Sequence, residues 1–249
     1  MSAARLHRDG ALAVLTLDNP PLNQINQELV DDLGSALHAV EGDAAVRAML
    51  VRADGEVFSA GADVNLFAGR GADAVRPLVG RFLDFGRRLE ALPFPTLAAV
   101  HGACAAGGLE LALFCDLIWA AEGTRIGLPE TRIGIVPLAG GVQRVAARAG
   151  LGRARSVALG GNLFPAERME AWGVVDRVLP ADQLQAGAEK FARTLAEGPA
   201  QAFAVVKRLC RAYAAGSVAA ADDRLLDDAV GLFDTEEAQA GFARFLAQL

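Results

Sequence analysis

The sequence predicts an α/β fold followed by a helical C-terminal region, and two observations carry this prediction. Up to about Leu179, short apolar segments alternate with segments whose apolar residues have helical spacing, a pattern typical of βαβ units and a mainly parallel sheet. Beyond that point, four successive segments have helical spacing, with Gly or Pro at the joints. We assign residues 1–190 to the core and 191–249 to the helical region, which we expect to pack on its own core or on a neighbouring subunit.

The individual elements can be assigned in chain order. The expected strands are residues 12–21, which end at an Asn-Pro-Pro turn, and then 45–53, 96–100, 115–121 and 124–129. The expected helices of the core are residues 26–43, 74–92 and 108–114, and residues 58–67 form a turn-rich connection. In the C-terminal region we expect helices at 181–198, 199–216, 217–233 and 235–249.

Composition excludes several classes of protein. The chain has 249 residues and a net charge of −6 without a block of like charges, whereas nucleic-acid binders normally carry a basic stripe. No apolar run approaches the roughly 20 residues that span a bilayer, and we do not expect the first residues to act as a signal peptide. The three cysteines lack metal or disulfide spacing. We therefore expect a cytoplasmic protein that binds neither nucleic acid nor membrane.

Three segments combine small residues with a single carboxylate. They are FSAGADVN (58–65), AAGGLE (105–110) and GLPETRIGIVPLAGGVQR (127–144). Each has an ordinary structural interpretation, with Asp63 as a helix N-cap, Glu110 on the exposed face of a helix and Glu130 in a surface loop. The alternative for Glu110 is an acid or base with a shifted pKa, beside a backbone site that only small residues permit.

In this order and spacing, the three segments resemble the signatures of the enoyl-CoA hydratase/isomerase (crotonase) superfamily, and the chain is most similar to its enoyl-CoA hydratases. The segments 15–37, 167–180 and 234–246 are also similar to family signatures, so the resemblance covers essentially the whole chain. It implies a crotonase-like fold, a spiral of ββα units with a C-terminal helical trimerisation region. It also implies a homotrimer or a homohexamer made of two trimers.

The resemblance implies a reaction that passes through a thioester enolate. The backbone N–H groups of Ala62 and Gly107 would form the oxyanion hole for its oxygen. Glu110 would activate the water that attacks C3, and Glu130 would supply the proton to C2 and orient the water. Because both glutamates are present, we expect reversible hydration of a 2-enoyl-CoA to a 3-hydroxyacyl-CoA. No metal or redox cofactor is implied, and coenzyme A enters as part of the substrate.

The resemblance further implies which residues bind the substrate, and two of these depart from the family pattern. The implied CoA and acyl contacts are Ala60, Ala62, Asp63, Val64, Asn65, Gly107 and Leu138, with the adenine along the backbone of Ala60, Ala62 and Val64. Asn65 stands where many relatives have a lysine near the CoA moiety. Leu138 stands where hydratases commonly have glycine, so its side chain would either crowd the water or trim the acyl pocket.

Other activities remain open. If Leu138 excludes water, the resemblance favours a Δ3,Δ2-enoyl-CoA isomerase that uses Glu130 alone, and other acyl-CoA lyases and hydrolases share the enolate chemistry. A non-catalytic acyl-CoA-binding subunit is disfavoured because both glutamates are retained. The sequence leaves open the acyl chain and the pathway, among them fatty-acid β-oxidation, aromatic-acid breakdown and branched-chain catabolism.

Overall fold

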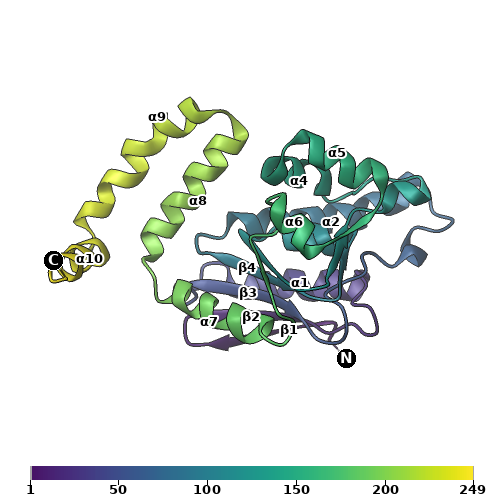
Figure 1. Ribbon diagram of the computed structural model, residues 1–249, viewed down its shortest axis with the longest axis horizontal. Helices are drawn as coiled ribbons and strands as arrows, with labels where there is room; N and C mark the ends of the chain where they lie inside the picture. The colour runs from purple at the N-terminus through teal and green to yellow at the C-terminus, as the bar shows by residue number, and fades with distance from the viewer. Residues whose placement is uncertain (1, 249) are drawn as a thin grey trace.

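The computed structural model describes residues 2–248, in which the strands form a larger and a smaller sheet (Figure 1). The larger sheet has the order β1-β2-β3-β4-β6-β9, with β1 (Ala4–Asp9), β2 (Leu12–Leu17), β3 (Ala48–Ala53), β4 (Thr96–Val100), β6 (Leu117–Ala121) and β9 (Arg177–Leu179). Only β1 and β2 pair antiparallel among these described strands, and the other pairs are parallel. The smaller sheet has the order β5-β7-β8, with β5 (Ala103–Ala105), β7 (Arg125–Gly127) and β8 (Leu163–Pro165).

Ten helices and three short 3-10 turns complete the described chain. The helices are α1 (Gln27–Val40), α2 (Ala72–Ala91), α3 (Gly107–Leu113), α4 (Gly141–Ala149), α5 (Leu151–Gly160), α6 (Ala166–Ala171), α7 (Leu184–Ala196), α8 (Ala200–Ala215), α9 (Val218–Ala229) and α10 (Glu236–Leu246). The turns are η1 (Val64–Leu66), η2 (Glu130–Ile133) and η3 (Val230–Asp234). Within residues 2–248, every helix is too short or too polar to cross a membrane.

The larger sheet buries both of its faces, which follows from the apolar composition of its strands. In β2, Ala13 and Leu15 face the core that contains helices α1, α2 and α3, whereas Leu12 and Val14 face α7. Successive side chains of a strand point to opposite faces, so an uninterrupted apolar strand needs a helix on each side. Figure 1 shows α1 and α2 on one side of the sheet and α7 on the other.

The predicted mainly parallel α/β core is confirmed, and the structure adds short strands and three helices that the sequence does not predict. Strands β1, β5, β8 and β9 have no counterpart among the predicted elements, and they are six, three, three and three residues long. Helices α4, α5 and α6 have none either. The predicted strand 115–121 begins only at Leu117. Asp116 precedes it because its carboxylate accepts hydrogen bonds from the N–H and hydroxyl groups of Thr96, at 2.8 and 2.9 Å.

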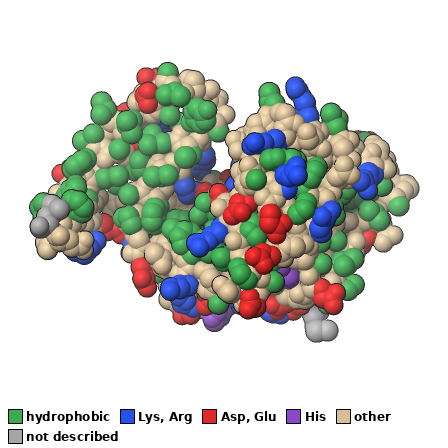
Figure 2. All heavy atoms as spheres, in the orientation of Figure 1, with side chains coloured by type: hydrophobic (Ala, Val, Ile, Leu, Met, Phe, Trp, Pro, Cys, Tyr) green, Lys and Arg blue, Asp and Glu red, His purple; other side chains and the backbone are tan. Residues whose placement is uncertain are grey.

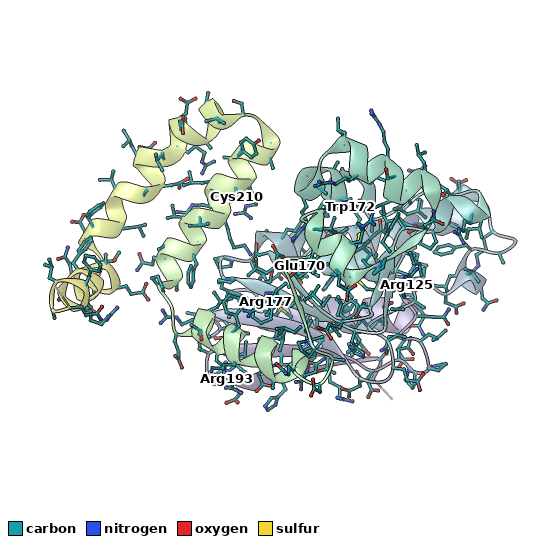
Figure 3. All side chains as sticks on the ribbon, viewed as in Figure 1. Arg125, Glu170, Trp172, Arg177, Arg193 and Cys210 are labelled. Atoms are coloured by element: carbon teal, nitrogen blue, oxygen red, sulfur yellow. The ribbon has the colours of Figure 1, made fainter. Side chains whose placement is uncertain are left out.

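The C-terminal helices differ in how they meet the core. Helix α7 packs on the sheet, and Arg193 on this helix donates to Asp9 of β1 at 2.6 Å (Figure 3). Helices α8, α9 and α10 extend away from the sheet (Figure 1). Residue 190, at which we divided the chain, falls inside α7. The division into two regions therefore stays a prediction. By its packing on the sheet, α7 belongs with the core.

Candidate active site

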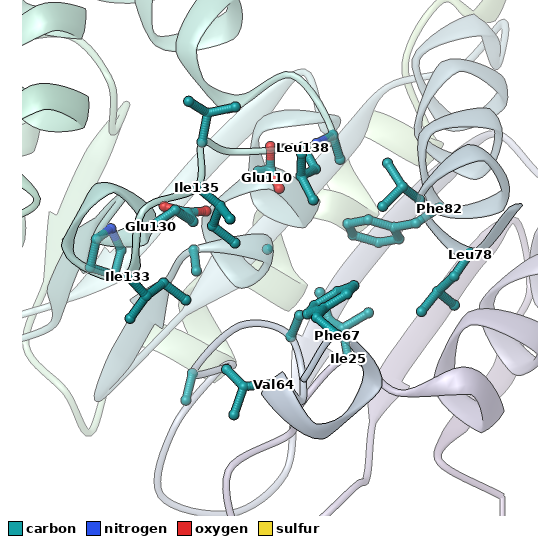
Figure 4. A pocket seen from close by; sticks show the side chains of 18 of the residues that line it. Ile25, Val64, Phe67, Leu78, Phe82, Glu110, Glu130, Ile133, Ile135 and Leu138 are labelled. Carbon is teal, nitrogen blue, oxygen red and sulfur yellow. Dashed lines mark hydrogen bonds between the residues drawn. The ribbon is translucent and has the colours of Figure 1, made fainter. Parts of the chain in front are cut away.

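A cavity of about 330 Å³ is lined by Glu110 and Glu130, two of the three acids that the sequence singles out. It is bordered by segment 60–64, by helix α2, by the N-terminal end of α3 and by segment 129–139. Figure 4 shows Glu110 and Glu130 on one side of this cavity and apolar side chains, among them Phe67 and Phe82, on the other. The fold thus brings together two acids that lie on separate elements.

Two backbone N–H groups, those of Ala62 and Gly107, border the same cavity. Neither donates a hydrogen bond to another group in residues 2–248. Gly61 and Asp63 both bond to Ile25, at 2.8 and 3.1 Å, which leaves the intervening N–H of Ala62 pointing the other way. A Cβ added to Gly107 would lie 3.7 Å from the Ala62 nitrogen. The two unused donors therefore lie close together at the edge of the cavity, and their role as an oxyanion hole stays a prediction.

Close contact between two backbone segments creates this space. A Cβ added to Gly61 would lie only 2.6 Å from the Cβ of Ala106, and one on Gly108 would lie 2.6 Å from the carbonyl oxygen of Ser59. Ala106 itself adopts a φ of 52°, a conformation that is uncommon for residues other than glycine. The small residues of the two motifs are thus needed because side chains would separate the segments 59–62 and 105–108.

Glu110 is buried and anchored by backbone amides. The residue is 3% exposed, and its Oε1 accepts hydrogen bonds from the N–H groups of Ala139 at 2.8 Å and Gly141 at 2.9 Å. Burial raises the pKa of Glu110, and these amides and the Arg144 guanidinium oppose the rise. The interpretation of Glu110 as a residue on an exposed helix face is therefore wrong.

Glu130 is buried without a comparable anchor. It is 8% exposed, and its Oε2 has no hydrogen-bond partner among the described residues. Burial raises the pKa of Glu130 to about 7; its own backbone amide opposes this rise, and the neighbouring charge of Glu110 adds to it. The interpretation of Glu130 as a surface-loop residue is wrong as well. The two acids therefore lie in different environments, because backbone amides stabilise the charged form of Glu110, whereas one oxygen of Glu130 is unpaired among the described residues.

The predicted substrate-binding residues do not all face the cavity. Ala60, Ala62, Val64 and Leu138 line it. Asp63 and Asn65 are not among the lining residues, because the carboxylate of Asp63 accepts hydrogen bonds from the Asn65 backbone N–H at 3.0 Å and from its side-chain amide at 2.8 Å. Asp63 is the N-cap of η1, as its ordinary interpretation predicts. Contacts of these two residues with CoA stay a prediction.

The rest of the cavity is lined by residues that the sequence marks only weakly. The part beyond the carboxyl groups is lined by Ile25, Val30, Phe67, Leu78, Val79 and Phe82. Leu78 and Phe82 follow one another at helical spacing on α2, a pattern that predicts a buried face but does not distinguish a core from a cavity wall. Phe85 and Trp119, by contrast, lie in the hydrophobic core. The amides of Ala139 and Gly141 carry no side-chain signal at all.

A family model described as enoyl-CoA hydratase/isomerase matches residues 7–249 of the chain. The chain belongs to this enoyl-CoA hydratase/isomerase family. The resemblance predicted from the motifs is thereby confirmed, and so is the crotonase-like α/β fold with its additional C-terminal helices.

Individual members of the family agree with this assignment. The chain is 37% identical over 200 residues to a probable enoyl-CoA hydratase of Bacillus subtilis, covering 77% of each chain. It is 32% identical over 246 residues to a probable enoyl-CoA hydratase of Mycobacterium bovis, covering 97% of this chain and 93% of the relative. The solved structure of an enoyl-CoA hydratase from Bacillus anthracis superposes with a TM-score of 0.93 at 27% identity, over 99% of this chain and 96% of the other.

Within this enoyl-CoA hydratase/isomerase family member, the cavity contains the components of acid–base chemistry on a carbonyl compound. It offers one anchored carboxyl group, one carboxyl group whose pKa is raised to about 7 and two N–H groups without an acceptor among the described residues. An acyl-CoA substrate is the kind of molecule that the family processes.

Proposed function

We propose that the protein is an enoyl-CoA hydratase, a hydro-lyase that adds water reversibly to a 2-enoyl-CoA and gives a 3-hydroxyacyl-CoA. The observation that carries this proposal is the difference between the two buried acids. Glu110 is stabilised as an anion by two amides, whereas Glu130 has a pKa of about 7 and an unpaired buried oxygen. Hydration needs one group of each kind, because a base must remove a proton from the water that attacks C3 and an acid must give a proton to C2.

The proposed reaction assigns a separate role to each group. The thioester oxygen accepts hydrogen bonds from the N–H groups of Ala62 and Gly107, which stabilise the enolate charge. Glu110 takes a proton from water as the water oxygen bonds to C3, and the C2–C3 π electrons move toward the thioester. Glu130 then gives its proton to C2. The product gains one OH and one H, and the two carboxyl groups must exchange one proton before the next turnover.

This chemistry draws only on carboxyl groups and backbone amides, so we propose that no metal or redox cofactor takes part. Coenzyme A belongs to the substrate. We propose a cytoplasmic location, which fits the free thiols of Cys104, Cys115 and Cys210, all three within the described residues. A place in fatty-acid β-oxidation is one setting in which this reaction occurs.

The test follows the loss of enoyl-thioester absorbance when purified protein is added to crotonyl-CoA and to longer 2-enoyl-CoAs. Glu110→Gln and Glu130→Gln are each expected to lower kcat by about 10²–10⁴-fold, while Glu28→Gln serves as the control. Glu28 is exposed, in the first turn of α1 and outside the cavity. Wild-type protein that leaves every 2-enoyl-CoA unchanged would overturn the proposal.

The position of Leu138 favours a second candidate, the Δ3,Δ2-enoyl-CoA isomerase that uses Glu130 alone. Its side chain lines the cavity and lies close to Glu110 in Figure 4, so it takes up space on the side where the attacking water would bind. The two candidates differ in a direct assay, because an isomerase produces conjugation from a 3-enoyl-CoA without consuming water. An isomerase would also retain its activity in Glu110→Gln, whereas a hydratase would lose it.

We also propose that the protein forms a homotrimer or a homohexamer through its C-terminal helices. Support comes from large apolar side chains that are exposed on α8, α9, η3 and α10, among them Val206, Tyr213, Leu226, Phe233, Phe245 and Leu246. Figure 2 shows apolar side chains gathered over this part of the chain. Large contiguous apolar patches on a protein surface often mark sites of protein–protein contact. Light scattering after size-exclusion chromatography tests this, and a mass equal to the single 25.9 kDa chain would contradict it.

A further inference from the structure

Arg144 of α4 lies behind the loop that anchors Glu110 and contacts that loop from the side away from the carboxylate. Its side chain is 16% exposed. One guanidinium nitrogen, Nη1, donates to the carbonyl oxygens of Ala139 at 3.1 Å and Gly140 at 3.3 Å. A Cβ added to Gly140 would lie 2.1 Å from Nη1, so the guanidinium occupies the space that the absent side chain leaves.

The guanidinium is itself held on two further sides. Its Nε and Nη2 donate to the two carboxylate oxygens of Glu90, each at 2.7 Å, in a bidentate pair. The guanidinium carbon lies 4.5 Å from the centre of the Phe114 ring, within the range of a cation–π contact. Glu90 is on α2 and Phe114 follows α3, so Arg144 is fixed against the same two helices that wall the cavity.

The peptide group between Gly140 and Gly141 connects Arg144 to Glu110. Its carbonyl oxygen accepts from Arg144, and its N–H donates to Oε1 of Glu110 at 2.9 Å. Hydrogen bonding at a carbonyl polarises the peptide group and strengthens the bond that its N–H donates. The chain of contacts runs from Glu90 through Arg144 and one peptide group to the carboxylate of Glu110.

We propose that Arg144, fixed by Glu90, is a positioning residue that orients the Gly140–Gly141 peptide and thereby holds the carboxyl group of Glu110 in place as the base. The inference rests on the proposed hydratase function only for its kinetic readout. The charged groups that face Glu110 are Glu130 from η2 and Arg144 from α4. Loss of the Arg144 charge removes the cation that opposes the burial of Glu110 and leaves the acid Glu130 in place.

The first measurement follows the titration of Glu110 directly by carboxyl-carbon NMR in a Glu130→Gln background, so that a single buried carboxyl group of the cavity titrates. Adding Arg144→Met is expected to move the Glu110 midpoint upward by about one pH unit, at the low end of the effect of a nearby opposite charge. Glu90→Gln is expected to move it in the same direction by less. An unchanged midpoint in Arg144→Met overturns the proposal, whatever reaction the protein catalyses.

Arg148 provides the matched control on the same helix. Its side chain is 18% exposed, it pairs with Asp176 at 3.2 Å, and it donates to the carbonyl oxygens of Cys115 and Asp116 at 2.7 and 2.9 Å. Arg148→Met therefore removes a comparably buried and bonded arginine that does not contact the Glu110 loop. Equal shifts of the Glu110 midpoint in the two variants would show a general effect of charge or folding and would overturn the positioning role.

The second measurement is kinetic and uses the proteins with Glu130 intact. Arg144→Met is expected to lower kcat for hydration by about 10–100-fold with KM changed less than threefold, and to move the acidic limb of the pH profile to higher pH. Arg144→Lys, which retains the charge but not the forked contacts, is expected to recover part of kcat. A wild type without hydratase activity would defeat the proposed function but not the NMR result. A loss confined to KM would overturn the positioning role.

Discussion

Nζ of Lys207 lies 2.7 Å from Oδ2 of Asp116 and 2.9 Å from the carbonyl oxygen of Phe94. Lys207 is buried on α8, the first helix that extends beyond the sheet, and Asp116 immediately precedes β6. Asp116 also accepts two hydrogen bonds from Thr96. The contact therefore connects the C-terminal helices to the edge of the central strands through one lysine.

Replacing this lysine is expected to destabilise the protein. In Lys207→Met, Asp116 loses its cation while it stays partly buried, at a cost of about 2 kcal/mol, below the value for a fully buried pair because Asp116 is 31% exposed. Urea unfolding measures the effect. Lys190, the only other lysine of the sequence, is exposed on α7, and Lys190→Met is expected to change the free energy of unfolding by less than about 0.5 kcal/mol. Equal effects would contradict this account.

Glu130 is expected to reduce stability as pH rises. The pKa of Glu130 in the folded protein is raised to about 7, above the pKa of a glutamate in the unfolded chain. The contribution of Glu130 to the free energy of unfolding is therefore fully present below the pKa of the unfolded glutamate and is lost as pH rises through about 7. At pH 8 the folded protein must bury a charge, which Glu130→Gln avoids. We expect this variant to gain on the order of 1–3 kcal/mol at pH 8 and almost nothing at pH 4.5. Thermal unfolding at both pH values measures the difference, and a gain independent of pH would contradict it.

The close approach of Gly61 to Ala106 predicts a loss of activity that can be separated from backbone strain. Gly61 has a φ of 101° and would clash on gaining a Cβ, whereas Gly55 has a φ of 88° and open space around it. Both alanine variants therefore carry a similar conformational cost, of about 1–2 kcal/mol. Only Gly61→Ala displaces the N–H of Ala62, and we expect its kcat to fall about 10²–10³-fold relative to Gly55→Ala. Similar kcat values would show that the oxyanion donors lie elsewhere.

The apolar end of the cavity predicts selection against charged acyl groups. Among its lining residues beyond the glutamates, the only charged side chain is that of Arg132, which donates to Asn162 at 2.6 Å. A terminal carboxylate would be buried there without a partner, at a cost of several kcal/mol. We expect kcat/KM for a straight-chain 2-enoyl-CoA to exceed that of its carboxylate-terminated analogue of equal length by at least about 10²-fold. Comparable values would mean that the acyl group lies outside this cavity.

The sequence predicts a site residue where the residue type and its neighbours are unusual together. It does not predict contacts that are made by backbone groups, because these do not depend on the type of side chain. Glu110 and Glu130 could be selected because a carboxylate within an apolar, glycine-rich segment is unusual. Their burial and their different partners could not be deduced, because the N–H groups of Ala139 and Gly141 belong to residues that have no polar side chain. The short strands β5 and β8 escaped prediction for a similar reason, since three residues contain too little periodicity to detect.

The anchoring of Glu110 by main-chain amides has a consequence for how the site tolerates substitution. Apart from proline, every amino acid at position 139 or 141 supplies the same N–H group, so the identity of the side chain there does not decide whether these two hydrogen bonds can form. The vulnerable positions are instead those that shape the loop, such as Gly140 with its φ of 93° and Gly141 beside Glu110. In a saturation mutagenesis experiment, Ala139 should therefore accept small replacements, while the two glycines that follow it should accept almost none.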